Sequence, residues 1–231
     1  MWKPHSYQEL AQEYARRPAS GLLLDPGLGK TSVMLSVMQP NTLVVAPKVL
    51  LKQTWMEEND KWGFGHDMVI LEGTANKRTK LLKEDHDVYL INPELVPWLA
   101  GERSGKYRSS EVKRVFDSVV VDESTRFKSH SAKRFKALSR MIWAQGSGQR
   151  SRTILTGTPV AKNASDLWAQ VYLLDKGERL GKTITEFRRR YCYQGGFKGR
   201  EWIPRPDAAK RIAEVCSDLL LRMDNELLDM P

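Results

Sequence analysis

The sequence predicts an α/β fold in which a mostly parallel sheet lies between layers of helices. Short apolar runs rich in β-branched residues recur along the chain, and segments of helical length separate them. The runs do not alternate with polar residues, which is typical of strands buried on both faces. The predicted strands span residues 22–24, 42–46, 68–71, 88–91, 118–121 and 153–155, and the clearest helices span 31–38, 50–61 and 131–143.

The composition supports one domain that covers all 231 residues. Hydrophobic residues make up 41% of the chain, which is enough for a large core and excludes a disordered or collagen-like protein. No apolar run approaches the roughly 20 residues of a membrane-spanning helix, and the N-terminus lacks a secretory signal. Cys192 and Cys216 lack the spacing of a metal site or a disulfide scaffold. We therefore expect a cytoplasmic protein with two buried thiols and no membrane partner.

Basic residues are concentrated in two parts of the chain. The whole sequence holds 37 Lys and Arg against 28 Asp and Glu. Residues 101–152 contain 13 basic and 5 acidic side chains, and residues 176–211 contain 11 and 4. This uneven positive charge favours a polyanionic partner such as a nucleic acid, although the exposed faces of ordinary helices produce the same count.

A glycine-rich turn follows the first predicted strand and precedes a predicted helix, as in a P-loop. Two glycines allow the backbone to adopt positive φ and to approach phosphate oxygens, and the N–H groups at the helix start act as donors. Lys30 is expected to bind the β- and γ-phosphates of ATP and to act in catalysis, and the Thr31 hydroxyl to hold Mg²⁺. The candidate nucleotide-binding residues of the turn are Gly27, Leu28, Gly29, Lys30 and Thr31.

An acidic pair follows the predicted strand at residues 118–121. Asp122, at the carboxyl end of that strand, is expected to hold Mg²⁺ together with Thr31. Glu123 is the candidate catalytic residue that orients or deprotonates the attacking water. The alternative interpretation is an Asp-Glu pair that only caps the next helix.

These motifs and others in order along the chain resemble the first RecA-like lobe of superfamily 2 helicases, specifically the Swi/Snf-type branch of DNA translocases. Leu24 replaces the usual first glycine of the P-loop, which is similar to helicase-type loops. The resemblance implies a RecA-like P-loop domain that uses ATP and Mg²⁺, and the compact motifs favour a phage or bacterial member. The other matching segments are Tyr7-Gln8, Ala46-Pro47-Lys48, Asp122-Glu123-Ser124-Thr125, Lys128 and Leu155-Thr156-Gly157-Thr158-Pro159.

The resemblance also implies roles for individual residues. Gln8 matches the glutamine that recognises adenine, and Lys48 and Lys128 match positions that contact nucleic acid. Thr156 and Thr158 lie in the motif that couples nucleotide to nucleic acid. A second RecA-like lobe, which carries the arginine fingers in this family, is expected as a partner and is absent from these 231 residues.

One departure affects the coupling. Ser124 and Thr125 stand where the family has Ala and His. Any coupling that the family histidine provides between the nucleotide and the Thr156 motif must therefore use another side chain here, and Thr125 and Thr156 are the candidates.

Further candidates for nucleic-acid contact come from charge and helical spacing. Lys133 and Lys136 share one face of the predicted helix at 131–143, opposite an apolar stripe. These lysines are candidate phosphate contacts, and a merely solvated face remains the alternative. Arg188, Arg189 and Arg190 form a further basic group, and the same two interpretations apply to it.

Two functions from different classes are consistent with these patterns. The first is the ATP-binding motor lobe of an ATP-dependent DNA helicase or translocase that acts on the backbone without reading sequence. Duplex DNA is the favoured substrate, and single-stranded DNA or RNA remains possible. The second is a non-hydrolysing nucleotide- and nucleic-acid-binding module with a regulatory role.

Overall fold

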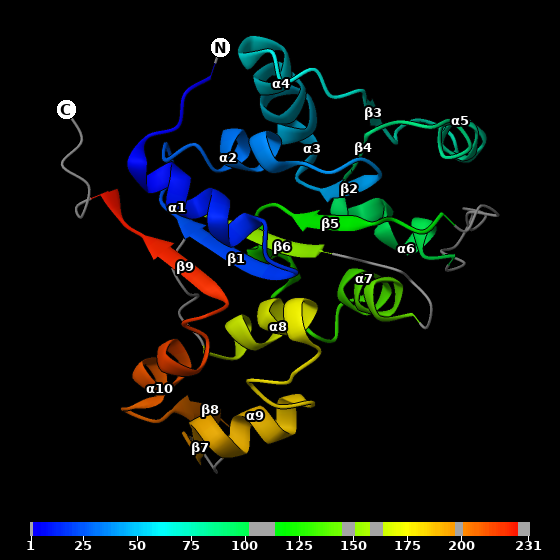
Figure 1. Cartoon of the computed structure of the whole chain (residues 1–231). Helices are drawn as coiled ribbons and strands as arrows, with labels where there is room; N and C mark the ends of the chain where they lie inside the picture. Colours follow the sequence, from blue (N-terminus) through cyan, green and yellow to red (C-terminus); the bar gives the residue numbers. More distant parts are fainter. Residues whose placement is uncertain (1, 102–113, 145–150, 158–163, 197–200, 226–231) are drawn as a thin grey trace.

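A seven-stranded parallel sheet forms the centre of the protein (Figure 1). The computed structural model describes residues 2–101, 114–144, 151–157, 164–196 and 201–225. The fold is therefore the predicted α/β class, with the RecA-like arrangement of a mostly parallel sheet between helices. In spatial order the strands are β3 (Met68–Ile70), β4 (Val88–Ile91), β2 (Thr42–Val45), β5 (Ser118–Val121), β6 (Ser151–Thr156), β1 (Ala19–Leu24) and β9 (Leu220–Met223).

Helices cover both faces of the sheet because successive strand side chains point to opposite faces. Leu43 and Val45 of β2 lie in one buried cluster, together with Phe135 from the helix layer on that side. Val44 lies in a second cluster, together with Ala11 from the opposite layer. The first face carries α6 (Val96–Leu99), α7 (Lys133–Trp143) and α8 (Ala164–Asp175), and the second carries α1 (Ser6–Ala15), α2 (Lys30–Val37), α3 (Lys48–Leu50) and α4 (Glu57–Trp62).

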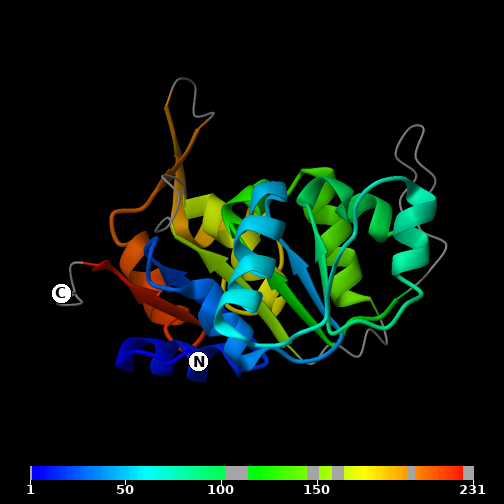
Figure 2. The same ribbon diagram turned by 90° about the horizontal axis from the view of Figure 1, so that it is seen from above.

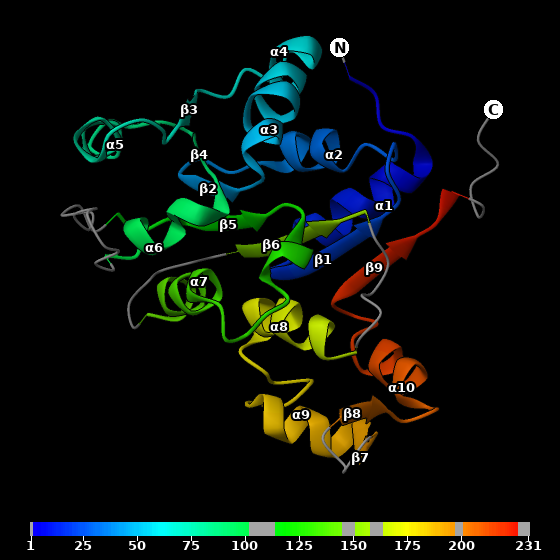
Figure 3. The same ribbon diagram turned by 180° about the vertical axis from the view of Figure 1, so that it is seen from behind.

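The chain between α8 and β9 forms a smaller unit that packs beneath the first helix layer. Figure 2 shows that its two-stranded antiparallel hairpin projects away from the central sheet, and Figure 3 shows that the chain then returns to the sheet edge through α10. The unit is anchored by Phe187, which is fully buried, and by the Trp168 indole N–H, which donates to the Gly181 carbonyl at 2.8 Å. Its elements are α9 (Ile184–Tyr191), β7 (Cys192–Gly195), β8 (Glu201–Pro204) and α10 (Ala208–Val215).

The six strands predicted from apolar runs are all present, whereas two features differ from expectation. The predicted helix at 50–61 consists of α3, a π-helical segment over Leu51–Met56, and α4. The second difference is β9, which is not among the predicted strands and which pairs with β1 in parallel. The remaining helices are α5 (Ala75–Leu81) and two 3₁₀ turns at Pro93–Leu95 and Ser124–Phe127.

Two smaller expectations are also addressed by the structure. Cys192 and Cys216 are free and buried, as predicted. Burial raises the pKa of the Cys216 thiol to about 12, so it stays protonated near neutral pH. Within the described residues, no helix is both long and apolar enough to cross a membrane.

A candidate nucleotide site at the carboxyl edge of the sheet

Three adjacent strands bring the candidate site together. β5, β6 and β1 are neighbours and run parallel, so their carboxyl ends meet at one edge of the sheet. Asp122 follows β5, Gly157 follows β6, and the glycine-rich turn follows β1. Ligands of open α/β sheets bind outside the carboxyl ends of the strands, which is where these segments lie.

The glycine-rich turn has the backbone conformation of a phosphate-binding loop. Gly27 has φ 90° and open space where a Cβ would stand, and Gly29 has φ 73° at the N-cap of α2. The Lys30 ammonium donates to the carbonyls of Leu24 at 2.7 Å and Asp25 at 3.1 Å. Both bonds hold the Lys30 ammonium group against the backbone of its own turn, in which Gly27 is exposed.

Electrostatics also connect this lysine to the next strand. Burial lowers the pKa of Lys30, and the negative charges of Asp122, Glu123 and Asp25 oppose that shift. The lysine therefore lies within electrostatic range of both predicted acidic residues. The structure thus brings together the two motifs that are about 90 residues apart in the sequence.

Gln8 and Leu28 take up different roles around the turn. Gln8 is buried, accepts from the His5 N–H at 3.0 Å and donates to the Leu28 carbonyl at 3.3 Å. A Cβ on Gly29 would lie 2.5 Å from the Gln8 amide nitrogen and would displace that side chain, and the positive φ of Gly29 favours glycine as well. The Leu28 side chain is fully buried in the core, so only its backbone can face a nucleotide.

Asp122 is held by a residue from a distant part of the sequence. Its carboxylate is buried and accepts from the Trp55 indole N–H at 3.0 Å and from the Glu123 N–H at 2.9 Å. Burial raises the pKa of Asp122, while the bond from Trp55 opposes the shift. The contact with Trp55, which is fully buried, was not predicted from the sequence.

Glu123 follows with an unusual backbone conformation. Its φ is 49°, in the left-handed region, which is uncommon for a residue with a side chain. It is half-buried and precedes the 3₁₀ turn at Ser124–Phe127. A strained backbone supported by its surroundings is frequent at functional sites.

The end of β6 lies directly against the glycine-rich turn. A Cβ on Gly157 would approach the Lys30 ammonium nitrogen and the Pro26 ring, each at 3.3 Å. Thr156, the preceding candidate for coupling, is buried at the last position of β6. Thr158 lies outside the described residues.

The donor set around this edge suits magnesium. Mg²⁺ prefers oxygen ligands and is commonly bound through one or two carboxylates together with phosphates and water. Asp122 and Thr31 supply a carboxylate and a hydroxyl, and Thr31 is buried in the first turn of α2. No group of three or more His, Cys, Asp or Glu side chains within the described ranges has the arrangement of a metal site. A nucleotide-bound ion fits these residues better than a metal held by protein ligands alone.

The family model of the SNF2-related domain matches residues 5–229 of the chain. The chain belongs to the SNF2-related domain family. It is 31% identical over 217 residues to a protein called "Putative protein p41" of Acyrthosiphon pisum secondary endosymbiont phage 1, and the match covers 86% of this chain and 45% of that protein. It is 27% identical over 171 residues to the ISWI chromatin-remodeling complex ATPase ISW1 of Saccharomyces cerevisiae, covering 67% of this chain and 14% of the relative.

The fold also matches a solved structure. The Sulfolobus solfataricus SWI2/SNF2 ATPase core, described in complex with dsDNA, aligns with a TM-score of 0.74 and 22% identity. The alignment covers 100% of this chain and 47% of that one. The SNF2-related domain therefore spans less than half the length of each of these relatives.

The candidate nucleic-acid contacts of this SNF2-related domain are exposed. Lys48 begins α3, directly after the carboxyl end of β2, and Lys133 and Lys136 lie on the solvent side of α7. Phe135 and Leu138 are buried on the opposite side of α7, as the spacing predicts. Lys128 is 57% exposed, and its ammonium nitrogen lies 3.7 Å from a carboxylate oxygen of Asp166. Exposure makes all four lysines accessible to phosphates, and Lys128 is already engaged in an ion pair.

A second unpredicted contact involves the residue that replaces the family alanine. Ser124 is fully buried, and its hydroxyl donates to the Gln170 side-chain oxygen of α8 at 2.6 Å. The Gln170 amide donates in turn to the Asp166 carbonyl at 3.1 Å. A buried hydroxyl two positions after Asp122 signals a polar partner, but the sequence alone does not identify Gln170, 46 residues away.

Proposed function

We propose that this SNF2-related domain is the ATP-binding motor lobe of an ATP-dependent DNA translocase or helicase that acts on the nucleic-acid backbone. The convergence of Lys30, Asp122 and Gly157 at one sheet edge carries this proposal. Duplex DNA is the favoured substrate because the structural neighbour is described in complex with dsDNA. Exposed lysines, which contact phosphates without reading bases, are the candidate interface.

Each nucleotide-site residue has a definite part in the proposal. Lys30 exchanges its bonds to two backbone carbonyls for bonds to the β- and γ-phosphates of ATP. Thr31 and Asp122 hold Mg²⁺, which neutralises phosphate charge when it is bound. Glu123 orients the attacking water, and Gln8 contacts the adenine after releasing the Leu28 carbonyl.

The proposed motor needs a second RecA-like lobe to complete its cleft. Phosphoryl transfer depends on positioning and charge stabilisation, and a missing arginine finger costs a factor of about 10³ to 10⁵ in rate. The 231 residues should therefore bind ATP with Mg²⁺ weakly and hydrolyse it slowly or not at all.

The test measures steady-state ATP hydrolysis by these 231 residues, with and without duplex DNA. A second sample joins them to the second lobe of a SNF2-family relative, and Lys30→Ala in the joined protein is the control. We expect DNA-stimulated turnover only in the joined protein with Lys30 intact. Turnover of about 1 per second or faster by the isolated chain would contradict the incomplete cleft. No turnover in the joined protein, with ATP still bound, would instead favour the non-hydrolysing regulatory module.

A further inference from the structure

Three basic side chains from separate segments lie together beside α7. Lys136 comes from α7, His130 from the segment before it, and Arg188 from α9. Burial lowers the pKa of the His130 imidazole, and the charges of Arg188 and Lys136 lower it further. His130 therefore lies within electrostatic range of both cations. We call Lys136, His130 and Arg188 the α7–α9 cluster.

Aromatic contacts hold two members of the α7–α9 cluster in place. The His130 ring packs edge-on against Trp168, with the ring centres 5.9 Å apart. The Arg188 guanidinium lies 5.7 Å from the ring centre of Trp202 in the β7–β8 hairpin, within the range of a cation–π contact. The β7–β8 hairpin therefore positions the Arg188 guanidinium through an aromatic contact rather than through a carboxylate.

Two neighbouring cations on the same helices are already engaged in ion pairs. Arg134 of α7 pairs with Glu94 at 2.8 Å, and Arg190 of α9 pairs with Glu186. Within the described ranges, Lys136 and Arg188 have no ion-pair partner, and the Arg188 Nε atom is buried without a hydrogen bond. Unpaired like charges held close together repel one another, which favours a polyanion as the missing partner.

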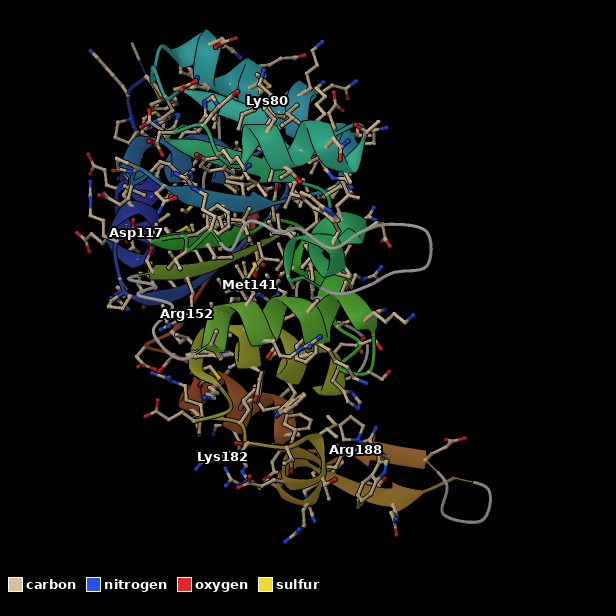
Figure 4. All side chains as sticks on the ribbon, turned by 90° about the vertical axis from the view of Figure 1, so that its right-hand side faces the viewer. Lys80, Asp117, Met141, Arg152, Lys182 and Arg188 are labelled. Atoms are coloured by element: carbon tan, nitrogen blue, oxygen red, sulfur yellow. The ribbon has the colours of Figure 1, made fainter. Side chains whose placement is uncertain are left out.

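Arg188 and the β7–β8 hairpin lie on the side of the molecule where the nucleotide site lies. In Figure 4, Asp117 and Arg152, which mark the starts of β5 and β6, are at the left, and Arg188 lies to the right beside the hairpin. The strands run from left to right in that view, so the hairpin projects on the side of their carboxyl ends. A strand of phosphates that contacts Lys128 and α7 can therefore continue toward Arg188.

We propose that the α7–α9 cluster is an additional contact for the phosphate backbone of duplex DNA, with Arg188 held for this purpose by the β7–β8 hairpin. The inference rests on the proposed function, because it extends the same nucleic-acid path beyond Lys48 and Lys128. Arginine suits the position because its planar fork binds phosphate oxygens with two donors while its face stacks on an indole.

The test measures the affinity of the chain for one labelled duplex of mixed sequence at several salt concentrations. Each phosphate neutralised on duplex DNA contributes about −0.9 to the slope of log K against log salt, so Arg188→Gln should flatten the slope by about 0.9. The double variant Arg188→Gln, Lys136→Gln should flatten the slope by about 1.8. The ratio of wild-type to double-variant affinity should then fall about twelvefold as the salt concentration rises from roughly 50 to 200 mM.

Two matched variants separate contact from structure. Arg190→Gln removes the same charge from the same helix but breaks an existing ion pair, and it should leave the slope near the wild-type value. Arg188→Lys keeps the charge and should retain the wild-type slope. If Arg188→Lys flattens the slope as much as Arg188→Gln, the arginine only supports the hairpin and the inference fails.

The inference and the proposed function fail in different ways. A wild-type chain that shows no salt-dependent binding of duplex DNA would overturn both. Salt-dependent binding with an unchanged slope in Arg188→Gln would overturn the inference alone. A loss at Arg188→Gln that appears only with single-stranded DNA or RNA would overturn the choice of duplex.

Discussion

Replacing Trp55 with Phe should lower the free energy of unfolding by about 3 kcal/mol in the absence of Mg²⁺ and nucleotide. The indole N–H donates to the buried Asp122 carboxylate at 3.0 Å, and a hydrogen bond to a charged group contributes about 1.5–3 kcal/mol. The tryptophan is fully buried, so the smaller ring also leaves a cavity and adds about 1 kcal/mol. The two effects give the expected total.

A double-mutant cycle isolates the hydrogen bond from the cavity. Asp122→Asn replaces the carboxylate by a neutral acceptor, whose bond to the indole contributes about 0.5–1.5 kcal/mol. Trp55→Phe should therefore cost about 1 kcal/mol less in a chain that already carries Asp122→Asn than in the wild type.

The pH dependence follows from the pKa of Asp122. Burial raises this pKa in the folded protein, so the folded state binds a proton more tightly than the unfolded chain. The resulting stabilisation is present at low pH and is lost as the pH rises through the raised pKa. Asp122→Asn should remove that part of the pH dependence.

The free energy of unfolding of all four proteins in the cycle is measured by urea unfolding followed by far-ultraviolet circular dichroism. EDTA is present, and the pH is above the raised pKa of Asp122, so that its carboxylate is ionised. Circular dichroism avoids the loss of indole fluorescence in the variants. Effects that add to within about 0.3 kcal/mol would show that Trp55 only fills space and does not support Asp122. The m-values of the four proteins are compared as well, because equal m-values are needed for a direct comparison of their free energies of unfolding.

Three further predictions concern the site and its connections. In the protein joined to a second lobe, Lys30→Ala should lose ATP binding, whereas Glu123→Gln should keep ATP bound and block hydrolysis; equal loss of nucleotide affinity in both would make Glu123 structural. Removing Lys48 or Lys128 should each flatten the salt dependence of duplex binding by about 0.9, and unchanged slopes would return both lysines to the solvated surface. Ser124→Ala should lower the free energy of unfolding by about 1–3 kcal/mol, measured by urea, because it leaves a buried oxygen unpaired; a change below about 0.5 kcal/mol would contradict this reasoning.

The sequence predicts the central sheet well because burial on both faces leaves a local signal. β2, β4 and β5 are fully buried, and their apolar runs give their positions to within a residue. The glycine-rich turn is equally local, since its chemistry is contained in the consecutive residues 25–31. Such features need no knowledge of distant parts of the chain.

The features missed by the sequence depend on contacts between distant residues. The Trp55–Asp122 bond spans 67 positions and the Ser124–Gln170 bond spans 46, and no periodicity connects either pair. β9 is only partly buried at Leu220 and Leu221, so its short run resembles a connecting segment. Its place beside β1 is determined by the return of the chain through α10, which is a property of the topology.

The two unpredicted bonds together explain how Glu123 is held. Trp55 holds Asp122 from one face of the sheet, and Gln170 holds Ser124 from the helix layer on the other face. Glu123 lies between these two anchors in a left-handed conformation, so a shift of either anchor changes its position.

The second anchor also leads toward the candidate nucleic-acid contacts. Gln170 donates to the carbonyl of Asp166, and the Asp166 carboxylate pairs with Lys128. A phosphate that binds Lys128 competes with Asp166 for the same ammonium group, which releases the first turn of α8 from that ion pair. Because α8 contacts Ser124 through Gln170, and Ser124 follows Glu123, this competition would connect phosphate binding at Lys128 to the position of the candidate catalytic carboxylate. In the proposed function, the serine that replaces the family alanine would then supply a connection that does not require the family histidine.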